Sequence, residues 1–161
     1  MTGGAGFIGS HVVRALLERE HEVVVLDDLS TGKRENLPES SRLTLQVGDV
    51  ADPTAVAAAL SGCSAFVHLA AVASVERSVQ DPLLTHRTNL QGSIQLFDEA
   101  ARQGVKRGLY ASSAAVYGDS PNLPLSEDEA PRPLTPYAID KLAGEQYLAY
   151  YHHSGRLNGT A

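Results

Sequence analysis

Apolar and polar positions follow one another along this chain in two distinct patterns. Residues 23–26 and 65–69 are nearly continuous apolar runs, which is typical of strands covered on both faces. Residues 43–47 alternate apolar with polar side chains, which predicts a strand at the edge of a sheet. A fourth strand is expected over residues 107–112. Because segments of helical periodicity separate these runs, the pattern indicates βαβ units and a parallel sheet.

Capping residues and prolines mark where helices are expected to begin. Each expected start has a side-chain cap followed by proline at the first helical position, where the N–H group would be unpaired in any case: Asp52-Pro53, Asp81-Pro82 and Thr135-Pro136. Apolar spacing predicts an amphipathic helix over 83–103, with Leu90, Ile94, Phe97 and Ala101 on its apolar face. A last helix is expected over 136–153, and the proline-rich, acidic segment 118–134 is expected to be a surface loop.

Length and composition place the chain among globular proteins and exclude several functions. The 161 residues predict one domain over 1–161, and 43% of them are hydrophobic. A net charge of −6 without a basic run argues against nucleic acid or an anionic membrane as the main partner. The single cysteine predicts neither a disulfide framework nor a cysteine-rich metal site. Without a secretory signal pattern or a long apolar run, the sequence predicts a cytoplasmic protein.

A glycine-rich turn near the start of the chain is the first candidate site. Gly3, Gly6 and Gly9 would let the backbone turn tightly and approach a pyrophosphate, which the following helix would meet with its N-terminal N–H groups. Asp27 ends the next expected strand, where a carboxylate can accept both ribose hydroxyls of NAD. Asp28 is either a further contact or simply a loop acid. The alternative is a glycine-rich surface turn, but the turn–helix–strand–aspartate order favours NAD binding by a Rossmann-type domain.

Two further groups of residues suggest chemistry on a bound substrate. Tyr137 and Lys141 share one face of the last expected helix, and a nearby ammonium lowers the pKa of a phenol toward that of a general base. Ser112 and Ser113 follow the fourth expected strand, beyond which ligands bind in open α/β sheets. The alternatives are a surface Tyr/Lys pair and two turn-forming serines.

Six ordered motifs give the chain a resemblance to a known family: Thr2-Gly3-Gly4-Ala5-Gly6-Phe7-Ile8-Gly9-Ser10-His11, Leu26-Asp27-Asp28-Leu29-Ser30-Thr31-Gly32, Gly48-Asp49-Val50, His68-Leu69-Ala70-Ala71, Ser112-Ser113-Ala114-Ala115-Val116-Tyr117-Gly118 and Tyr137-x-x-x-Lys141. Together they resemble the NAD-dependent epimerase/dehydratase family of extended short-chain dehydrogenases/reductases. Within that family the sequence is most similar to the UDP-glucose 4-epimerase group. The resemblance covers essentially the whole chain and implies a Rossmann-type, doubly wound parallel sheet.

The resemblance also implies roles for individual residues around NAD. Phe7 and Ile8 would lie at the pyrophosphate turn, and Asp27 would bind the adenosine ribose. Three further segments would line the cofactor, with Asn89 supporting the site from a helix: Asp28, Leu29, Ser30, Thr31 and Gly32; Asp49 and Val50, where the family holds the adenine; Leu69, Ala70 and Ala71. Tyr137 and Lys141 would contact the nicotinamide end.

The implied activity is epimerisation of a nucleotide-sugar, with a UDP-sugar as the expected substrate. Tyr137 would take a proton from a sugar hydroxyl as hydride moves to NAD, assisted by Lys141 and Ser113. Epimerisation would follow if the keto-sugar turned over and took the hydride back on its other face. Two alternatives stay open, a sugar-nucleotide dehydratase or reductase and an inactive NAD-binding fragment. The family's dehydratases carry an Asp-Glu pair where this chain has Ala114-Ala115, which favours the epimerase.

The family comparison also predicts how the chain is assembled and what it lacks. Family members have a central first strand before the glycine turn and a C-terminal region that binds the nucleotide-sugar. Neither is found in residues 1–161, so we expect a chain truncated at both ends, with the strand edges beside the missing strand unpaired. The helices over 83–103 and 136–153 are expected to form a homodimer through a four-helix contact.

Overall fold

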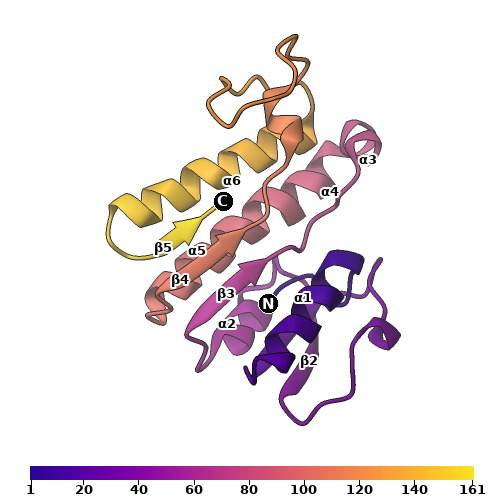
Figure 1. The fold of residues 1–161 in the computed structure, drawn as a ribbon, viewed down its shortest axis with the longest axis vertical. Helices are drawn as coiled ribbons and strands as arrows, with labels where there is room; N and C mark the ends of the chain where they lie inside the picture. Colours follow the sequence, from indigo (N-terminus) through magenta and orange to yellow (C-terminus); the bar gives the residue numbers. More distant parts are fainter.

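A computed structural model describes all residues, 1–161, as a parallel sheet flanked by helices (Figure 1). The strands are β1 (Val23–Asp27), β2 (Leu43–Val47), β3 (Ala65–His68), β4 (Arg107–Tyr110) and β5 (Asn158–Thr160). β1 pairs in parallel with β2, and β3, β4 and β5 pair in parallel in that order. The four predicted strands are therefore confirmed, and β2 lies at an edge as its alternating pattern indicated.

The first residues of the chain lie between β1 and β3. Thr2 forms single parallel bridges to Leu26 on one side and to His68 on the other. Its backbone N–H donates to the carbonyl of Val67 at 3.0 Å, and the N–H of Gly3 donates to that of Leu26 at 2.9 Å. No extended strand occupies this central position, but these residues join the two halves of the sheet at its carboxyl edge. The spatial order is therefore β2, β1, Thr2, β3, β4 and β5.

The helical segments follow the predicted starts closely: α1 (Phe7–Glu18), α2 (Pro53–Leu60), α3 (Val75–Gln80), α4 (Pro82–His86), a π-helical turn (Arg87–Gln91), α5 (Gly92–Arg102) and α6 (Pro136–His153), with 3-10 turns at Arg34–Asn36 and Ala114–Tyr117. The side chains of Asp52, Asp81 and Thr135 each accept a backbone N–H at the start of α2, α4 and α6, as predicted. The helix expected over 83–103 is continuous but contains the π turn. The sequence pattern gave no indication of α3.

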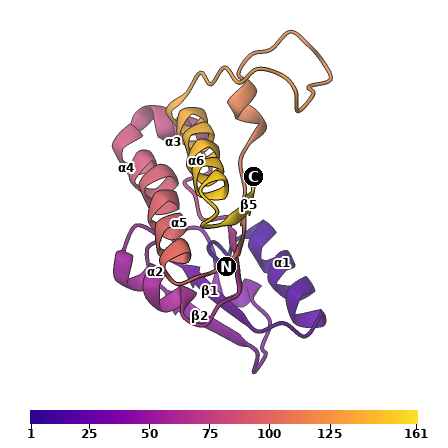
Figure 2. The same cartoon turned by 90° about the vertical axis from the view of Figure 1, so that its left-hand side faces the viewer.

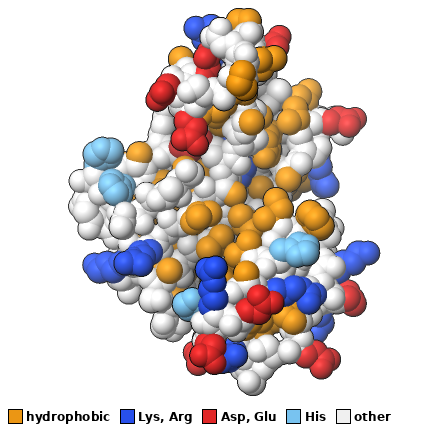
Figure 3. Space-filling model, viewed as in Figure 1, with side chains coloured by type: hydrophobic (Ala, Val, Ile, Leu, Met, Phe, Trp, Pro, Cys, Tyr) orange, Lys and Arg blue, Asp and Glu red, His pale blue; other side chains and the backbone are white.

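Helices cover the two faces of the sheet unequally. Figure 2 shows α1 on one face and α2, α5 and α6 on the other. Tyr110 of β4 points into the larger core with Phe97 of α5 and Leu148 of α6, whereas the alternate residue Leu109 is 45% exposed on the α1 face. Figure 3 shows hydrophobic side chains gathered across the middle of that face. No helix is long and apolar enough to cross a membrane.

The predicted apolar face of residues 83–103 needs a correction. Phe97 is fully buried as predicted, but Leu90, Ile94 and Ala101 are only partly buried, and the buried positions of α5 include the polar Ser93. Ser93 can face the core because its hydroxyl lies 2.9 Å from Nε2 of the buried His68. A pattern of apolar residues cannot reveal a buried serine. The predicted apolar face is therefore rotated around the helix axis relative to the face that is actually buried. His68 is itself fully buried, and its Nδ1 is hydrogen-bonded to the hydroxyl of Thr2.

Candidate functional site

The glycine turn between Thr2 and α1 is built from two glycines that no other residue could replace without strain. Gly3 has a φ of +68°, and a Cβ atom there would lie 2.7 Å from the backbone nitrogen of Ala70. A Cβ atom on Gly9 would lie 2.1 Å from the carbonyl oxygen of Gly3. These two glycines are therefore required for the turn to pack against β3 and against the start of α1.

Gly6 differs because its free side faces outward. A Cβ atom there would meet only the carbonyl oxygen of Gly3, at 3.4 Å, and its φ of −75° is open to any residue. Gly6 precedes α1, and no side chain caps this helix, so its first N–H groups are left for an outside acceptor. Phe7 and Ile8 are 80% and 65% exposed at the same place. The open, uncapped turn fits the pyrophosphate of a dinucleotide.

Asp27 lies at the carboxyl end of β1, beside the glycine turn. Its side chain is 7% exposed, and its two oxygens accept N–H groups from Ala5, at 2.9 Å, and from Leu29, at 3.0 Å. Each oxygen keeps further acceptor capacity, which a ribose hydroxyl could use. A Cβ atom on Gly32 would lie 2.9 Å from Oδ1 of Asp27, so the loop closes tightly over this carboxylate.

The rest of this loop is held by its own hydrogen bonds. Asp28 is exposed and accepts from the backbone N–H and the hydroxyl of Ser30, at 2.9 and 2.6 Å. Leu29 has a φ of +58°, and the loop continues through Thr31 to Gly32. In this structure Asp28 therefore orders the loop.

Two more strand-end loops border the same edge of the sheet. Asp49 and the buried Val50 follow β2, and Leu69, Ala70 and Ala71 follow β3. The N–H of Ala70 donates to the hydroxyl of Thr2 at 3.2 Å. Asn89 is 1% exposed, and its amide both accepts from the N–H of Val72 and donates to its carbonyl. Asn89 thus holds the loop after β3 in place, although it does not open onto the edge itself.

Lys141 reaches from α6 to the end of β4. It is 3% exposed, its ammonium donates to the carbonyl of Ala111 at 2.7 Å, and it lies 4.7 Å from the centre of the Tyr110 ring. Burial lowers the pKa of Lys141 to about 8. Tyr137 lies one turn earlier on α6 and is partly exposed. Tyr137 and Lys141 therefore share one face of α6 at this edge, one helical turn apart.

The two serines after β4 have different surroundings. Ser112 donates its hydroxyl hydrogen to Glu145 of α6. Ser113 accepts the N–H of Ala115 at 3.2 Å and so caps the 3-10 turn, which packs against α6. That bond leaves the hydroxyl hydrogen of Ser113 free to donate. Of the two candidates, Ser113 is the one available to a substrate oxygen.

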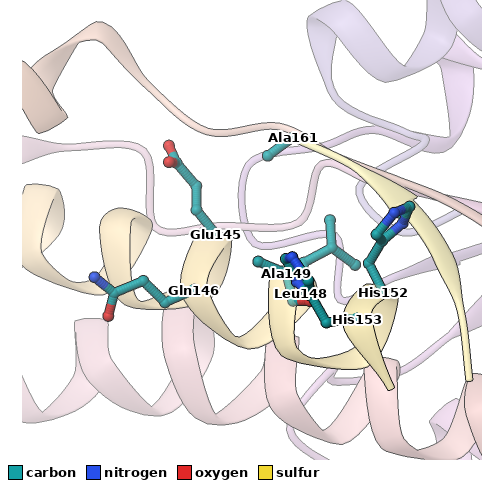
Figure 4. Close-up of a pocket in the computed structure, with 8 residues that line it drawn as sticks. Glu145, Gln146, Leu148, Ala149, His152, His153 and Ala161 are labelled. Carbon is teal, nitrogen blue, oxygen red and sulfur yellow. The ribbon is translucent and has the colours of Figure 1, made fainter. Parts of the chain in front are cut away.

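A surface pocket lies away from these residues. It is formed by the C-terminal half of α6 and by β5, and Figure 4 shows Glu145, His152 and His153 among the residues that line it. None of the sequence-predicted site residues lines it. Apart from Asn89 in the π-helical turn, the predicted residues instead follow the carboxyl ends of β1, β2, β3 and β4, form the glycine turn or lie in the first turns of α1 and α6. The sequence analysis did not identify Arg87 or Glu145. Arg87 contacts Asp49 and Glu145 contacts Ser112, and because the partners are far apart in the sequence, no local pattern reveals these contacts.

Comparison with known proteins finds relatives that match almost the whole chain. The model of the NAD-dependent epimerase/dehydratase family matches residues 1–161. The UDP-glucose 4-epimerase of Mycolicibacterium smegmatis is 43% identical over 163 residues, which cover 95% of this chain and 50% of that protein. This chain spans about half the length of the curated relatives it matches.

Two solved structures show the same fold. The UDP-glucose 4-epimerase of Thermus thermophilus in complex with NAD is 42% identical, with a TM-score of 0.92 over 98% of this chain and 51% of the other. The dTDP-glucose 4,6-dehydratase of Streptomyces venezuelae with NAD bound is 37% identical, with a TM-score of 0.91 over 98% of this chain and 52% of the other. The fold is therefore of Rossmann type, and the chain belongs to the NAD-dependent epimerase/dehydratase family of enzymes.

Proposed function

We propose that residues 1–161 form the NAD-binding part of a nucleotide-sugar 4-epimerase. The proposal rests on what lies at the carboxyl edge of the sheet. An open glycine turn, a carboxylate at the end of a strand and a Tyr/Lys pair are all found there. Gly6 and the start of α1 would hold the pyrophosphate, and Asp27 would accept the adenosine ribose hydroxyls. Lys141 would hold the nicotinamide ribose at the other end.

The chain's own residues would move a proton at the sugar. NAD, when bound, supplies a reversible hydride acceptor. Tyr137 would take the proton from the sugar 4-hydroxyl as the general base. The hydroxyl of Ser113 would donate to the same sugar oxygen and share that proton. The epimerisation would be complete once the turned-over keto-sugar has taken the hydride back at C4 on its other face and Tyr137 has returned the proton to its oxygen.

The local sequence around Ser113 favours epimerisation over dehydration. Elimination of water from the sugar needs an acid that protonates the leaving hydroxyl. Ala114 and Ala115 occupy the 3-10 turn directly after Ser113 and offer no such group. Similarity to a dehydratase structure keeps 4,6-dehydration as the second candidate. We assign a UDP-sugar as substrate, since relatives named as UDP-glucose 4-epimerases support it.

We also propose a homodimer through α5 and α6. Apolar side chains on these helices remain exposed away from the core, with Ile139 and Tyr150 52% and 57% exposed. Ile94 of α5 is also only partly buried. Sedimentation of the protein as a monomer at micromolar concentration would contradict this assembly.

Replacement of the phenol tests the proposed reaction. In a protein of the relatives' full length, Tyr137→Phe keeps the ring but removes the proton acceptor, so turnover of UDP-galactose should fall by about two to four orders of magnitude with NAD affinity nearly unchanged. Tyr147→Phe is the matched control, because Tyr147 lies on the same helix and is 42% exposed. If Tyr137→Phe kept most of the activity, Tyr137 would not be the base. Formation of a 4-keto-6-deoxy sugar would instead identify a dehydratase.

A further inference from the structure

The π-helical turn Arg87–Gln91 contacts two of the strand-end loops that border the proposed cofactor site. Arg87 donates to Oδ2 of Asp49, in the loop after β2, at 2.6 Å. Asn89, two residues later, binds both backbone groups of Val72 in the loop after β3. A π turn places residues on a helix surface at a spacing that a regular α-helix does not provide. One widened turn therefore holds both loops.

Close packing at the end of the same turn supports this arrangement. Gly92 begins α5, and a Cβ atom on it would lie 2.6 Å from Cγ1 of Val50. Val50 is buried and directly follows Asp49. The helix thus approaches the loop after β2 through both an ion pair and a tight apolar contact.

Arg87 fixes the orientation of the Asp49 carboxylate. Oδ1 of Asp49 accepts the N–H of Ala51 at 2.8 Å, and Oδ2 accepts from Arg87. Both oxygens are thereby anchored, yet the side chain is still 35% exposed. Each oxygen has a remaining lone pair, so the anchored carboxylate can accept one more N–H from outside.

The position of Asp49 indicates which part of a dinucleotide it would meet. Asp27 ends β1, and Asp49 lies just beyond the neighbouring edge strand β2, with the N–H of Gly48 donating to the carbonyl of Asp27 at 3.0 Å. An adenosine whose ribose is bound at Asp27 can extend its base toward β2. The exocyclic amino group of adenine is a donor that a carboxylate accepts, whereas a carbonyl oxygen at that place would be repelled.

We propose that Arg87 is a positioning residue that orients Asp49 toward the adenine amino group and thereby sets the base specificity of the site. This inference rests on the proposed NAD binding. The ion pair itself is half exposed at Arg87 and contributes little to folding, as exposed ion pairs generally do. Its loss should therefore change base recognition more than stability.

The test compares NAD with nicotinamide hypoxanthine dinucleotide, which carries a carbonyl in place of the adenine amino group. Dissociation constants of both are measured by calorimetry on a protein of the relatives' full length, as the wild type and with Arg87→Ala or Arg87→Lys. Arg102→Ala is the matched control, because Arg102 of α5 forms only a surface ion pair with Glu99, at 3.2 Å. Melting temperatures of all variants are recorded alongside.

We expect the wild type and Arg102→Ala to prefer NAD by about tenfold or more. Arg87→Ala should reduce this preference to about threefold or less without a comparable loss of melting temperature. Arg87→Lys should recover part of it, since lysine restores the charge but not the fixed geometry of the guanidinium. Unchanged base preference in Arg87→Ala, or equal loss in Arg102→Ala, would overturn the inference and leave the proposed function standing. If the wild type bound neither dinucleotide, the proposed function would fall and this inference with it.

Discussion

The Lys141 ammonium donates a hydrogen bond to the backbone carbonyl of Ala111, 2.7 Å away, and so joins α6 to the end of β4. Burial lowers the pKa of Lys141 to about 8, from a usual value of 10.5. Near neutral pH the group still carries its proton, so a positive charge is held beneath the turn that bears Tyr137. This contact holds the end of β4 against the first turns of α6.

Burial of Lys141 should make stability depend on alkaline pH. Between pH 8 and 10.5 the unfolded chain keeps the proton that the folded chain has lost, so the free energy of unfolding should rise with pH over this range. Compared with Lys141→Met, the wild type should gain up to about 3 kcal/mol across this interval. Urea unfolding of both proteins at stepped pH gives the difference. A difference that stays constant with pH would show that Lys141 titrates normally in the folded state.

Burial of His68 should destabilise the fold in acid. Desolvation lowers the pKa of His68 to about 3, from 6.5, while its ring nitrogens bind the hydroxyls of Thr2 and Ser93 at 2.5 and 2.9 Å. Below pH 6.5 the unfolded chain binds a proton that the folded chain does not, so stability is lost as the pH falls toward 3. Relative to His68→Gln, the wild type should lose about 1.4 kcal/mol for each pH unit in this range. If the unfolding free energies of the two proteins fell equally with pH, the lowered pKa of His68 would be contradicted.

Replacing Gly9 should affect folding, whereas replacing Gly6 should affect cofactor binding. Gly9→Ala places a Cβ atom 2.1 Å from a backbone oxygen and should cost about 2 kcal/mol or more in unfolding free energy. Gly6→Ala meets nothing closer than 3.4 Å and should leave stability nearly unchanged while weakening NAD binding. Thermal melts and NAD titrations of both variants provide the comparison. Equal NAD affinity in Gly6→Ala and the wild type would contradict the binding of the pyrophosphate at this turn.

Asp27 should govern the choice between NAD and NADP. Its carboxylate would accept the free 2′-hydroxyl of NAD and repel a 2′-phosphate, so NAD should bind more tightly. Asp27→Ala should narrow that difference but also lower the melting temperature, because the N–H groups of Ala5 and Leu29 lose their acceptor. Calorimetry with both cofactors checks the preference. Tighter binding of NADP by the wild type would refute this role for Asp27.

Residues 1–161 should be compared with a protein of the full length of the relatives, since they match only about half of those chains. We propose that the part of the relatives outside the matched half contributes to recognition of the sugar. The short chain should then show no measurable turnover with UDP-galactose and at best weak NAD binding, while the longer protein shows both. Turnover by residues 1–161 alone would contradict this division of the site.

Sequence patterns predicted the parts of this fold that depend on local chemistry. Four strands, three capped helix starts and the last helix all follow from short-range rules, such as the Thr135 cap on α6. The π turn and the buried face of α5 did not, because Ser93 is buried only through its contact with His68, distant in the sequence. The candidate site also has parts that a local motif reveals and parts that depend on contacts between distant residues. Gly3 and Asp27 were visible as a motif, whereas the contact of Arg87 with Asp49 joins residues 38 positions apart.

A crystal structure of the protein with NAD bound tests the central claim most directly. The account predicts the adenosine ribose hydroxyls within about 3 Å of the Asp27 carboxylate. The pyrophosphate should lie over Gly6, and the nicotinamide ribose should lie against Lys141, with the Tyr137 phenol beside the ring. NAD found elsewhere, for example in the pocket between α6 and β5, or bound at the edge with its nicotinamide far from Tyr137, would contradict the account.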